Sequence, residues 1–342
     1  MGSESVAESL RKSLLRMGRG ERMTAIEAVK SVVLEAMYRT CAEGYGLEVK
    51  ACPRCGCVEI VKKGHGADGS QRYLCNGCGR TFNAKTGKVV GMSKLPESTW
   101  MLYIQCFADR LSLRQCAARC GVSLPTSLFM RRRLLEIVER MLPAFSVGEG
   151  CGCELDETYF PENFKGNHSN SAFEIPRPAR KRGGEARFRG LSRDQVCVMT
   201  GINDGGDAFL EVSGRGALSA SRAVACLRGK VAEGSIVSTD KARAYPTALR
   251  ELDVAVHRAF ASSDRRVGTI NRVNSLHSNL ELFMAPFRGV ATKHLPEYLR
   301  WFAWDRVFAA GSAEVCGRLA RQTEAGVYHR RSADWWGLPV GV

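Results

Sequence analysis

The sequence predicts an α/β fold, in which small modules precede a larger domain of alternating strands and helices. Three observations support this prediction. Two C-x2-C pairs lie within residues 51–92, and apolar residues spaced three and four apart predict helices within residues 93–148. Short strand-like runs then alternate with helical segments across residues 149–310.

The amino-acid composition indicates which kinds of molecule the chain binds. The chain has 342 residues, enough for two or three domains. Its 50 Lys and Arg against 35 Asp and Glu give a net charge of +15, which predicts a nucleic-acid partner. No apolar run of about 18 residues is present, so we expect no membrane partner. Residues 1–13 lack the apolar core of a secretory signal, so we expect a cytoplasmic, nucleoid-associated protein whose cysteines are thiols or metal ligands.

Residues 1–50 are predicted to form an N-terminal helical segment. Apolar residues recur at helical spacing between residues 21 and 43, and Gly44 ends the pattern. Packing on a neighbouring helix, dimerisation and DNA contact all remain open as the role of this helix. Residues 311–342 are predicted to form a basic tail.

Residues 51–92 are predicted to form a zinc ribbon. Cys52 and Cys55 are separated by a 19-residue spacer from Cys75 and Cys78. Two such turns supply the four thiolates of a tetrahedral zinc site, and four sulfur ligands saturate the metal. The sequence therefore predicts one structural Zn²⁺. The basic residues around it either contact phosphates or form a solvated face: Arg54, Lys62, Lys63, His65, Arg72, Arg80, Lys85 and Lys88.

Residues 93–148 have the pattern of a helix-turn-helix DNA-binding domain. A helix over 96–109 precedes a shorter one, then a turn at Gly121, then a helix that starts after Ser123 with Pro125 in its first turn. In such a motif the second helix enters the major groove. The alternative is a small structural bundle that is merely basic. The predicted DNA contacts are Arg114, Arg131, Arg132 and Arg133.

Residues 149–310 contain the catalytic candidate. Predicted strands over 151–158, 195–202 and 208–212 precede alternating helices and strands, which is the order that a ribonuclease-H-like fold requires. A basic, Gly- and Pro-rich insertion, 161–194, cannot pack a core, and its Lys181 and Arg182 are predicted to grip DNA.

Two aspartates stand on predicted strands of this domain. Asp156 lies on the first strand, and Asp240 ends the strand over 236–239. Burying a carboxylate is costly unless a cation compensates it, and divalent metals prefer oxygen ligands. The alternative is that both are solvated residues at strand ends.

Several motifs in one order carry a family resemblance. They are C-P-R-C at 52–55, Y-L-C-N-G-C-G-R-T-F at 73–82, the helix-turn-helix, L-D-E-T-Y at 155–159, S-T-D-K at 238–241, R-V-N-S-L-H-S-N at 272–279 and F-R-G-V-A-T-K-H-L-P-E-Y at 287–298. Over residues 50–305 the chain resembles bacterial insertion-sequence transposases of the ISXO type, which join a zinc ribbon to a DDE-like nuclease domain.

The resemblance implies a DNA transposase. Asp156 and Asp240 match the first two catalytic acids, and Asn279 stands at the third position, where His277 and Glu281 remain open alternatives. Two Mg²⁺ or Mn²⁺ ions about 4 Å apart would assist strand cleavage and transfer. Double-stranded DNA, as the terminal inverted repeats of the element and as target, would be the substrate of a homo-oligomer. Two alternatives remain, namely a zinc-ribbon regulator with an inert nuclease domain and a nuclease without strand joining.

Overall fold

The computed structural model describes residues 3–18, 20–26, 28–29, 32–33, 49–67, 69–89, 91, 93–165, 194–261, 270–307, 315 and 317–319. The chain divides into two compact units, Met1–Ile137 with Ala310–Arg330 and Val138–Ala309 with Arg331–Val342. No helix within the described ranges is long and apolar enough to cross a membrane. The insertion over 166–193 and most of the tail lie outside these ranges.

The first unit begins with helix α1, Ser3–Arg16. Of the helix predicted over 21–43, residues 21–26, 28–29 and 32–33 are described, and they are helical.

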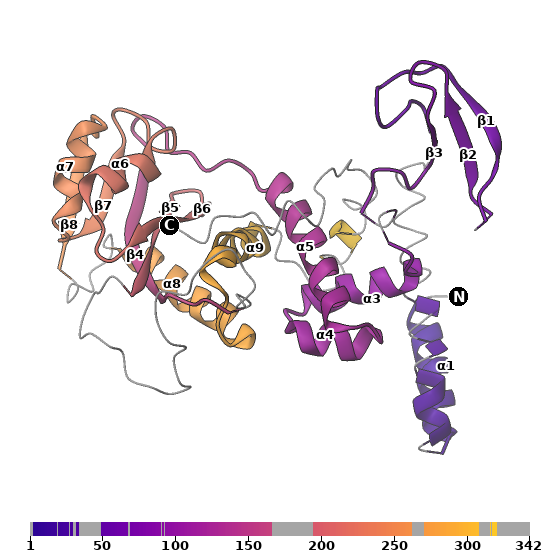
Figure 1. The fold of residues 1–342 in the computed structure, drawn as a ribbon. Coiled ribbons are helices and arrows are strands. Elements are labelled where there is room, and N and C mark those ends of the chain that lie inside the picture. The colour runs from indigo at the N-terminus through magenta and orange to yellow at the C-terminus, as the bar shows by residue number, and fades with distance from the viewer. Residues whose placement is uncertain are drawn as a thin grey trace. The chain divides into compact units, whose positions relative to one another are not determined.

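A small antiparallel sheet follows, with the strand order β1-β2-β3 (Figure 1). Its strands are β1 Ile60–His65, β2 Gln71–Cys75 and β3 Thr81–Asn83. Tyr73 stacks on Phe82 with the ring centroids 5.7 Å apart. The buried cluster here consists of Cys52, Cys75 and Phe82, so the cysteines supply much of the interior.

Three helices follow this sheet, α3 Glu97–Ala108, α4 Leu113–Cys120 and α5 Leu124–Met141. Helix α4 begins with a capping box in which Ser112 and Gln115 satisfy each other's backbone amides. Gly121 ends it in the left-handed conformation, φ 63°, which favours glycine. The helices therefore stand where the sequence places them.

The second unit is built on a five-stranded sheet with the order β6-β5-β4-β7-β8. Strand β4 is antiparallel to β5, and β5 to β6, whereas β7 is parallel to β4 and β8 to β7. The strands are β4 Gly152–Pro161, β5 Gln195–Asn203, β6 Ala208–Arg215, β7 Ile236–Asp240 and β8 Val256–Phe260. Three antiparallel strands followed by alternating helix and parallel strand is the order expected from the sequence.

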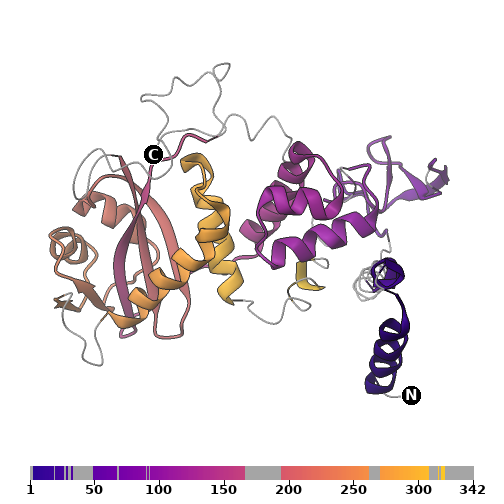
Figure 2. The ribbon, with the colours of Figure 1, turned by 90° about the horizontal axis from the view of Figure 1, so that it is seen from below.

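Helices cover both faces of this sheet (Figure 2). Helices α6 Ala220–Leu227 and α7 Ala244–Glu251 pack on one face, against a core that includes Leu155 and Val237. On the other face lie α8 Asn271–Met284 and α9 Leu295–Val307, joined through 3-10 turns at Ala285–Phe287 and Thr292–His294. Phe283 and Trp301 bind these two helices together, with ring centroids 5.2 Å apart.

Candidate active site

Four cysteine thiols converge in the small sheet. The sulfur atoms of Cys52, Cys55, Cys75 and Cys78 all lie within 4.8 Å of one another. Cys52 and Cys78 are 3.8 Å apart, and Cys55 and Cys75 are 3.5 Å apart. A tetrahedral zinc with Zn–S bonds of about 2.3 Å requires sulfur separations of about 3.8 Å. The arrangement can therefore hold one such ion.

The two cysteine turns have the same backbone geometry. Gly56 N–H donates to Cys52 O and Gly79 N–H to Cys75 O, both over 2.9 Å. Both glycines have positive φ, 74° and 66°, which lets each turn close tightly. The backbone N–H of Cys78 helps to lower the pKa of Cys75 to about 6, which favours the thiolate that a metal binds.

The second cluster contains three carboxylates. Carboxylate oxygens of Asp156, Glu157 and Asp240 lie within 4.8 Å of one another. Strands β4 and β7 run parallel, and their last paired residues are Glu154 and Ser238. Asp156 and Asp240 each follow two residues later, so the register brings both aspartates side by side just beyond the β4–β7 pairing.

The electrostatics of this cluster are unfavourable without a cation. Burial, together with the nearby charges of Glu157 and Asp240, raises the pKa of Asp156 to about 7. Burial also raises the pKa of Glu157. Three half-buried carboxylates at this separation repel one another, and a divalent cation relieves that repulsion with the oxygen ligands that it prefers. The donor set therefore fits Mg²⁺ or Mn²⁺.

Each carboxylate is oriented by the chain itself. Asp156 Oδ1 accepts the Glu157 N–H over 2.9 Å, and Asp240 Oδ1 accepts the Ala242 N–H over 2.8 Å. Glu157 Oε2 accepts the hydroxyl of Tyr245, on α7, over 2.6 Å. Glu157 was not among the residues expected from the sequence, since adjacent residues of a strand normally point to opposite faces. Its position beside Asp156 was the available signal.

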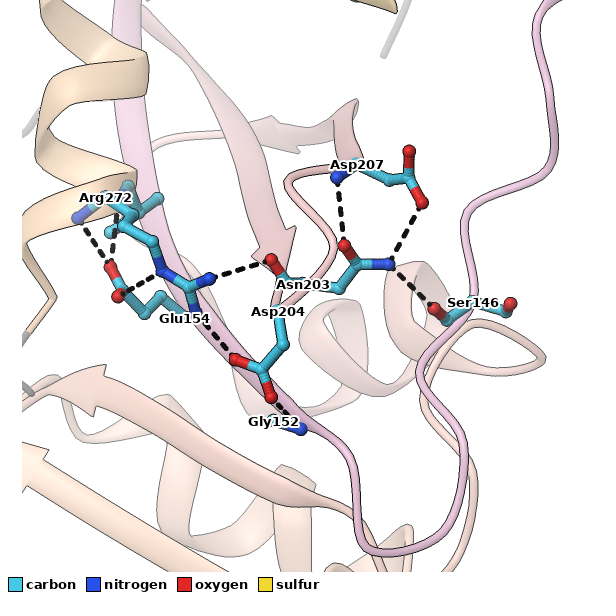
Figure 3. A network of polar contacts seen from close by, with 8 residues as sticks. Ser146, Gly152, Glu154, Asn203, Asp204, Asp207 and Arg272 are labelled. Atoms are coloured by element: carbon cyan, nitrogen blue, oxygen red, sulfur yellow. Dashed lines mark hydrogen bonds and ion pairs between the residues drawn. The ribbon is translucent and has the colours of Figure 1, made fainter.

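A polar network fixes the start of α8 on β4 (Figure 3). Glu154 Oε2 accepts the backbone N–H groups of Arg272 and Val273 over 2.8 and 3.0 Å, and Glu154 Oε1 accepts Arg272 Nε over 2.8 Å. The Arg272 guanidinium also reaches Asn203 O and Asp204 Oδ1, each over 3.0 Å. A carboxylate at the N-terminus of a helix accepts hydrogen bonds from the free N–H groups of the first turn and interacts favourably with the helix dipole.

Helix α8 presents His277, and not Asn279, to Asp156. His277 Nδ1 lies 3.7 Å from Asp156 Oδ2, and its Nε2 lies 2.7 Å from Thr200 Oγ1. Asn279 and Glu281 are exposed. Two residues correspond to about 200° of helical rotation, so Asn279 faces away from His277. Of the residues predicted from the sequence, the structure brings Asp156 and Asp240 together.

Comparison with known proteins adds one informative relative. No family model matches the chain. A protein of Halobacterium salinarum, described as an uncharacterized protein in transposable element ISH50, is 30% identical over 260 residues, which cover 75% of this chain and 84% of the relative. The chain belongs to the family of this transposable-element protein.

Solved structures resemble this family member only distantly. A chain of the simian T-cell lymphotropic virus intasome in complex with a PP2A regulatory subunit has a TM-score of 0.28 and 12% identity, covering 60% of this chain and 67% of that one. A chain of a pre-cleavage Mos1 transpososome has a TM-score of 0.18 and 11% identity, covering 65% and 78%. Likeness this weak does not establish a shared fold.

The arginines predicted to contact DNA in this family member differ in exposure. Arg114 is exposed on α4, whereas Arg131, Arg132 and Arg133 are buried, so the expectation that these three are free to reach DNA is wrong for this structure. Arg131 donates to Leu111 O over 2.6 Å and lies over the Phe107 ring, and Arg133 pairs with Glu136 over 3.1 Å. Lys181 and Arg182 lie outside the described residues.

Proposed function

We propose that this chain is an insertion-sequence transposase of the ISXO type, which binds the terminal inverted repeats of its own element, cleaves the DNA there and joins it to target DNA. The observation that carries the proposal is the meeting of Asp156, Glu157 and Asp240 where β4 and β7 end their pairing. Membership in the family of a protein found in a transposable element supports it.

The strand order of the second unit supports a ribonuclease-H-like catalytic domain. Three antiparallel strands precede the two parallel ones, and the carboxylates stand where β4 and β7 end their pairing. Ligand sites of α/β sheets commonly lie at the carboxyl ends of their strands.

The three carboxylates would hold Mg²⁺ or Mn²⁺. When bound, such ions supply Lewis-acid activation of the attacking oxygen and stabilisation of the leaving oxygen. The chain holds Asp156 and Asp240 in place through backbone amides and Glu157 through Tyr245, so the carboxylates need little reorganisation to bind. Water is the nucleophile for cleavage, and the freed 3′-hydroxyl attacks the target. The family resemblance implies Asn279 as the third ligand, but this residue is exposed and lies on the side of α8 opposite to His277.

In this proposal the first unit recognises the DNA. The four cysteines would hold a structural Zn²⁺, and exposed basic residues of the ribbon, such as Lys62, Lys63 and Arg72, would contact phosphates. A net charge of +15 favours such a partner. A homo-oligomer is expected, since two element ends must be held together for joining.

Nicking of DNA that carries the element's own inverted repeats tests the proposal. With Mg²⁺ or Mn²⁺ the purified protein should nick this DNA, whereas Asp156→Ala and Asp240→Ala should each abolish nicking without loss of fold. Glu233→Gln, an exposed acidic residue outside the cluster, is the matched control and should nick normally. Specific binding without nicking would instead favour a regulator with an inert nuclease domain. Nicking retained in both alanine variants would overturn the assignment of the site.

A further inference from the structure

We propose that His277 supplies a nitrogen ligand, through Nδ1, to the divalent cation held by Asp156 and its neighbours. This inference rests on the proposed metal site and names a further ligand within it. It places the contribution of α8 at His277 and not at Asn279.

The hydrogen bonds of Thr200 define the state of the imidazole ring. The Thr200 hydroxyl has one hydrogen, and it donates this hydrogen to Asp156 O over 2.9 Å. Thr200 Oγ1 must therefore accept at its 2.7 Å contact with His277 Nε2, so Nε2 carries a hydrogen. In a neutral imidazole the other nitrogen, Nδ1, then presents a lone pair.

That lone pair faces a carboxylate. Nδ1 lies 3.7 Å from Asp156 Oδ2, and both side chains are largely buried, with 15% and 16% of their surfaces exposed. Two acceptors this close together in a partly buried site repel each other. A shared cation removes this repulsion. Octahedral Mg²⁺ or Mn²⁺, with bonds of about 2.1 Å, holds adjacent ligand atoms about 3 Å apart, so the two side chains need to close by only about 0.7 Å to bind it.

The surroundings of the ring are those of a metal ligand. Ligating histidines usually donate their second ring N–H to a neighbouring acceptor, which fixes the tautomer and the ring orientation. Thr200 Oγ1 is such an acceptor, and Thr200 is itself completely buried. The same hydroxyl is bonded to the backbone of Asp156, so the two proposed ligands share one support.

The rival explanation is an ion pair between a protonated His277 and Asp156. A charge-assisted N–H···O bond normally measures about 2.7–2.9 Å, well below the observed 3.7 Å. The separation therefore suits an intervening cation better than a direct bond.

Pulsed electron paramagnetic resonance of bound Mn²⁺ separates these explanations. The full chain is loaded with zinc, Mn²⁺ is added, and electron spin echo modulation from directly bound ¹⁴N is recorded. We expect this modulation in the wild type, and we expect His277→Gln to lose it while binding Mn²⁺ roughly tenfold or more weakly. Glu281→Gln, an exposed position one turn away on α8, is the matched control and should keep the signal; Asn279→Ala should keep it as well.

The outcomes distinguish this inference from the proposed function. Wild-type protein that binds Mn²⁺ through Asp156 and Asp240 without ¹⁴N modulation would overturn the role of His277 and leave the metal site standing. Binding of Mn²⁺ that survives Asp156→Ala and Asp240→Ala unchanged would overturn the metal site itself. Absence of the modulation from the wild-type spectrum would overturn the role of His277 without any variant, and its loss in a folded His277→Gln protein assigns the nitrogen to this residue.

Discussion

Tyr245 shows how a single side chain can tune the carboxylate cluster. Its hydroxyl donates to Glu157 Oε2 over 2.6 Å from a completely buried position, whereas Tyr159 reaches Glu157 Oε1 only at 3.5 Å. A hydrogen bond to a charged group contributes about 1.5–3 kcal/mol to stability, and a longer contact contributes less. Tyr245 therefore fixes the direction of the Glu157 carboxylate.

We expect Tyr245→Phe to weaken Mn²⁺ binding, because the freed Glu157 carboxylate loses its orientation. Calorimetric titration of the zinc-loaded protein measures the change in affinity. Tyr159→Phe removes the longer contact and is the matched control, with a smaller expected loss. Equal affinities in wild type and Tyr245→Phe would show that this hydrogen bond does not orient Glu157 for the ion.

Local patterns predicted some ligands and not others. The cysteine spacing and the aspartates on strand-like runs are visible within a few residues of sequence, so Cys52, Cys75, Asp156 and Asp240 could be identified directly as candidate ligands. The approach of His277 depends on the rotation of α8 about its own axis. That rotation is set by contacts from β4 and β5, distant in sequence, which no local pattern encodes.

At the scale of elements, the bond between Glu154 and the start of α8 controls this rotation. The buried Glu154 carboxylate receives two backbone amides and one guanidinium nitrogen. We expect Glu154→Gln to lower the free energy of unfolding by about 1–3 kcal/mol, since a neutral amide with one oxygen cannot accept all three bonds. Hydrogen exchange of the first α8 amides should quicken as well.

Asp204→Asn is the matched control for this network. Asp204 contacts the same guanidinium, but its side chain is 65% exposed, so its ion pair contributes little. If the two variants changed α8 exchange equally, the carboxylate of Glu154 would not be what holds the helix.

The positions of helices α3 to α5 were predicted well, but the exposure of the arginines on α5 was not. Periodicity placed the turn at Gly121, but a run of three arginines on α5 suggested exposure. Arginine stems are long and apolar, and they can fill a core when the guanidinium finds partners. Arg131, 1% exposed, does so through Leu111 O and the Phe107 ring.

Substitution of Arg131 should therefore lower stability, whereas substitution of Arg114 should weaken DNA binding. Arg131→Ala should lower the free energy of unfolding by about 2–4 kcal/mol, because it leaves a cavity and unpaired groups. Arg114→Ala, at an exposed position, should change stability by no more than about 0.5 kcal/mol and instead weaken DNA binding with a shallower salt dependence. Thermal unfolding and binding at several salt concentrations measure both. Unchanged stability in Arg131→Ala would contradict the structural role.

At the scale of the whole molecule, the four-cysteine module and the second unit have different sources of stability. The second unit has its own extended core, which includes Leu155, Val237 and Tyr245. The described ribbon has a buried cluster of only Cys52, Cys75 and Phe82. Apolar burial on that scale does not offset the conformational entropy of an ordered module, so we expect this module to depend on the metal that its four cysteines can hold.

Removal of zinc should therefore abolish the specific binding of element ends and leave the binding of Mn²⁺ intact. Chelation, or Cys75→Ser, should abolish the amide protection of β1 and β2 and the specific binding of element ends, because metal binding supplies the folding free energy of such a module. The five-stranded unit should keep its amide protection and its affinity for Mn²⁺, since neither depends on the cysteines. Cys57→Ser, which changes a cysteine outside the four-sulfur cluster, is the matched control and should retain both. Protection of β1 and β2 that survived complete chelation would show that the ribbon folds without its metal.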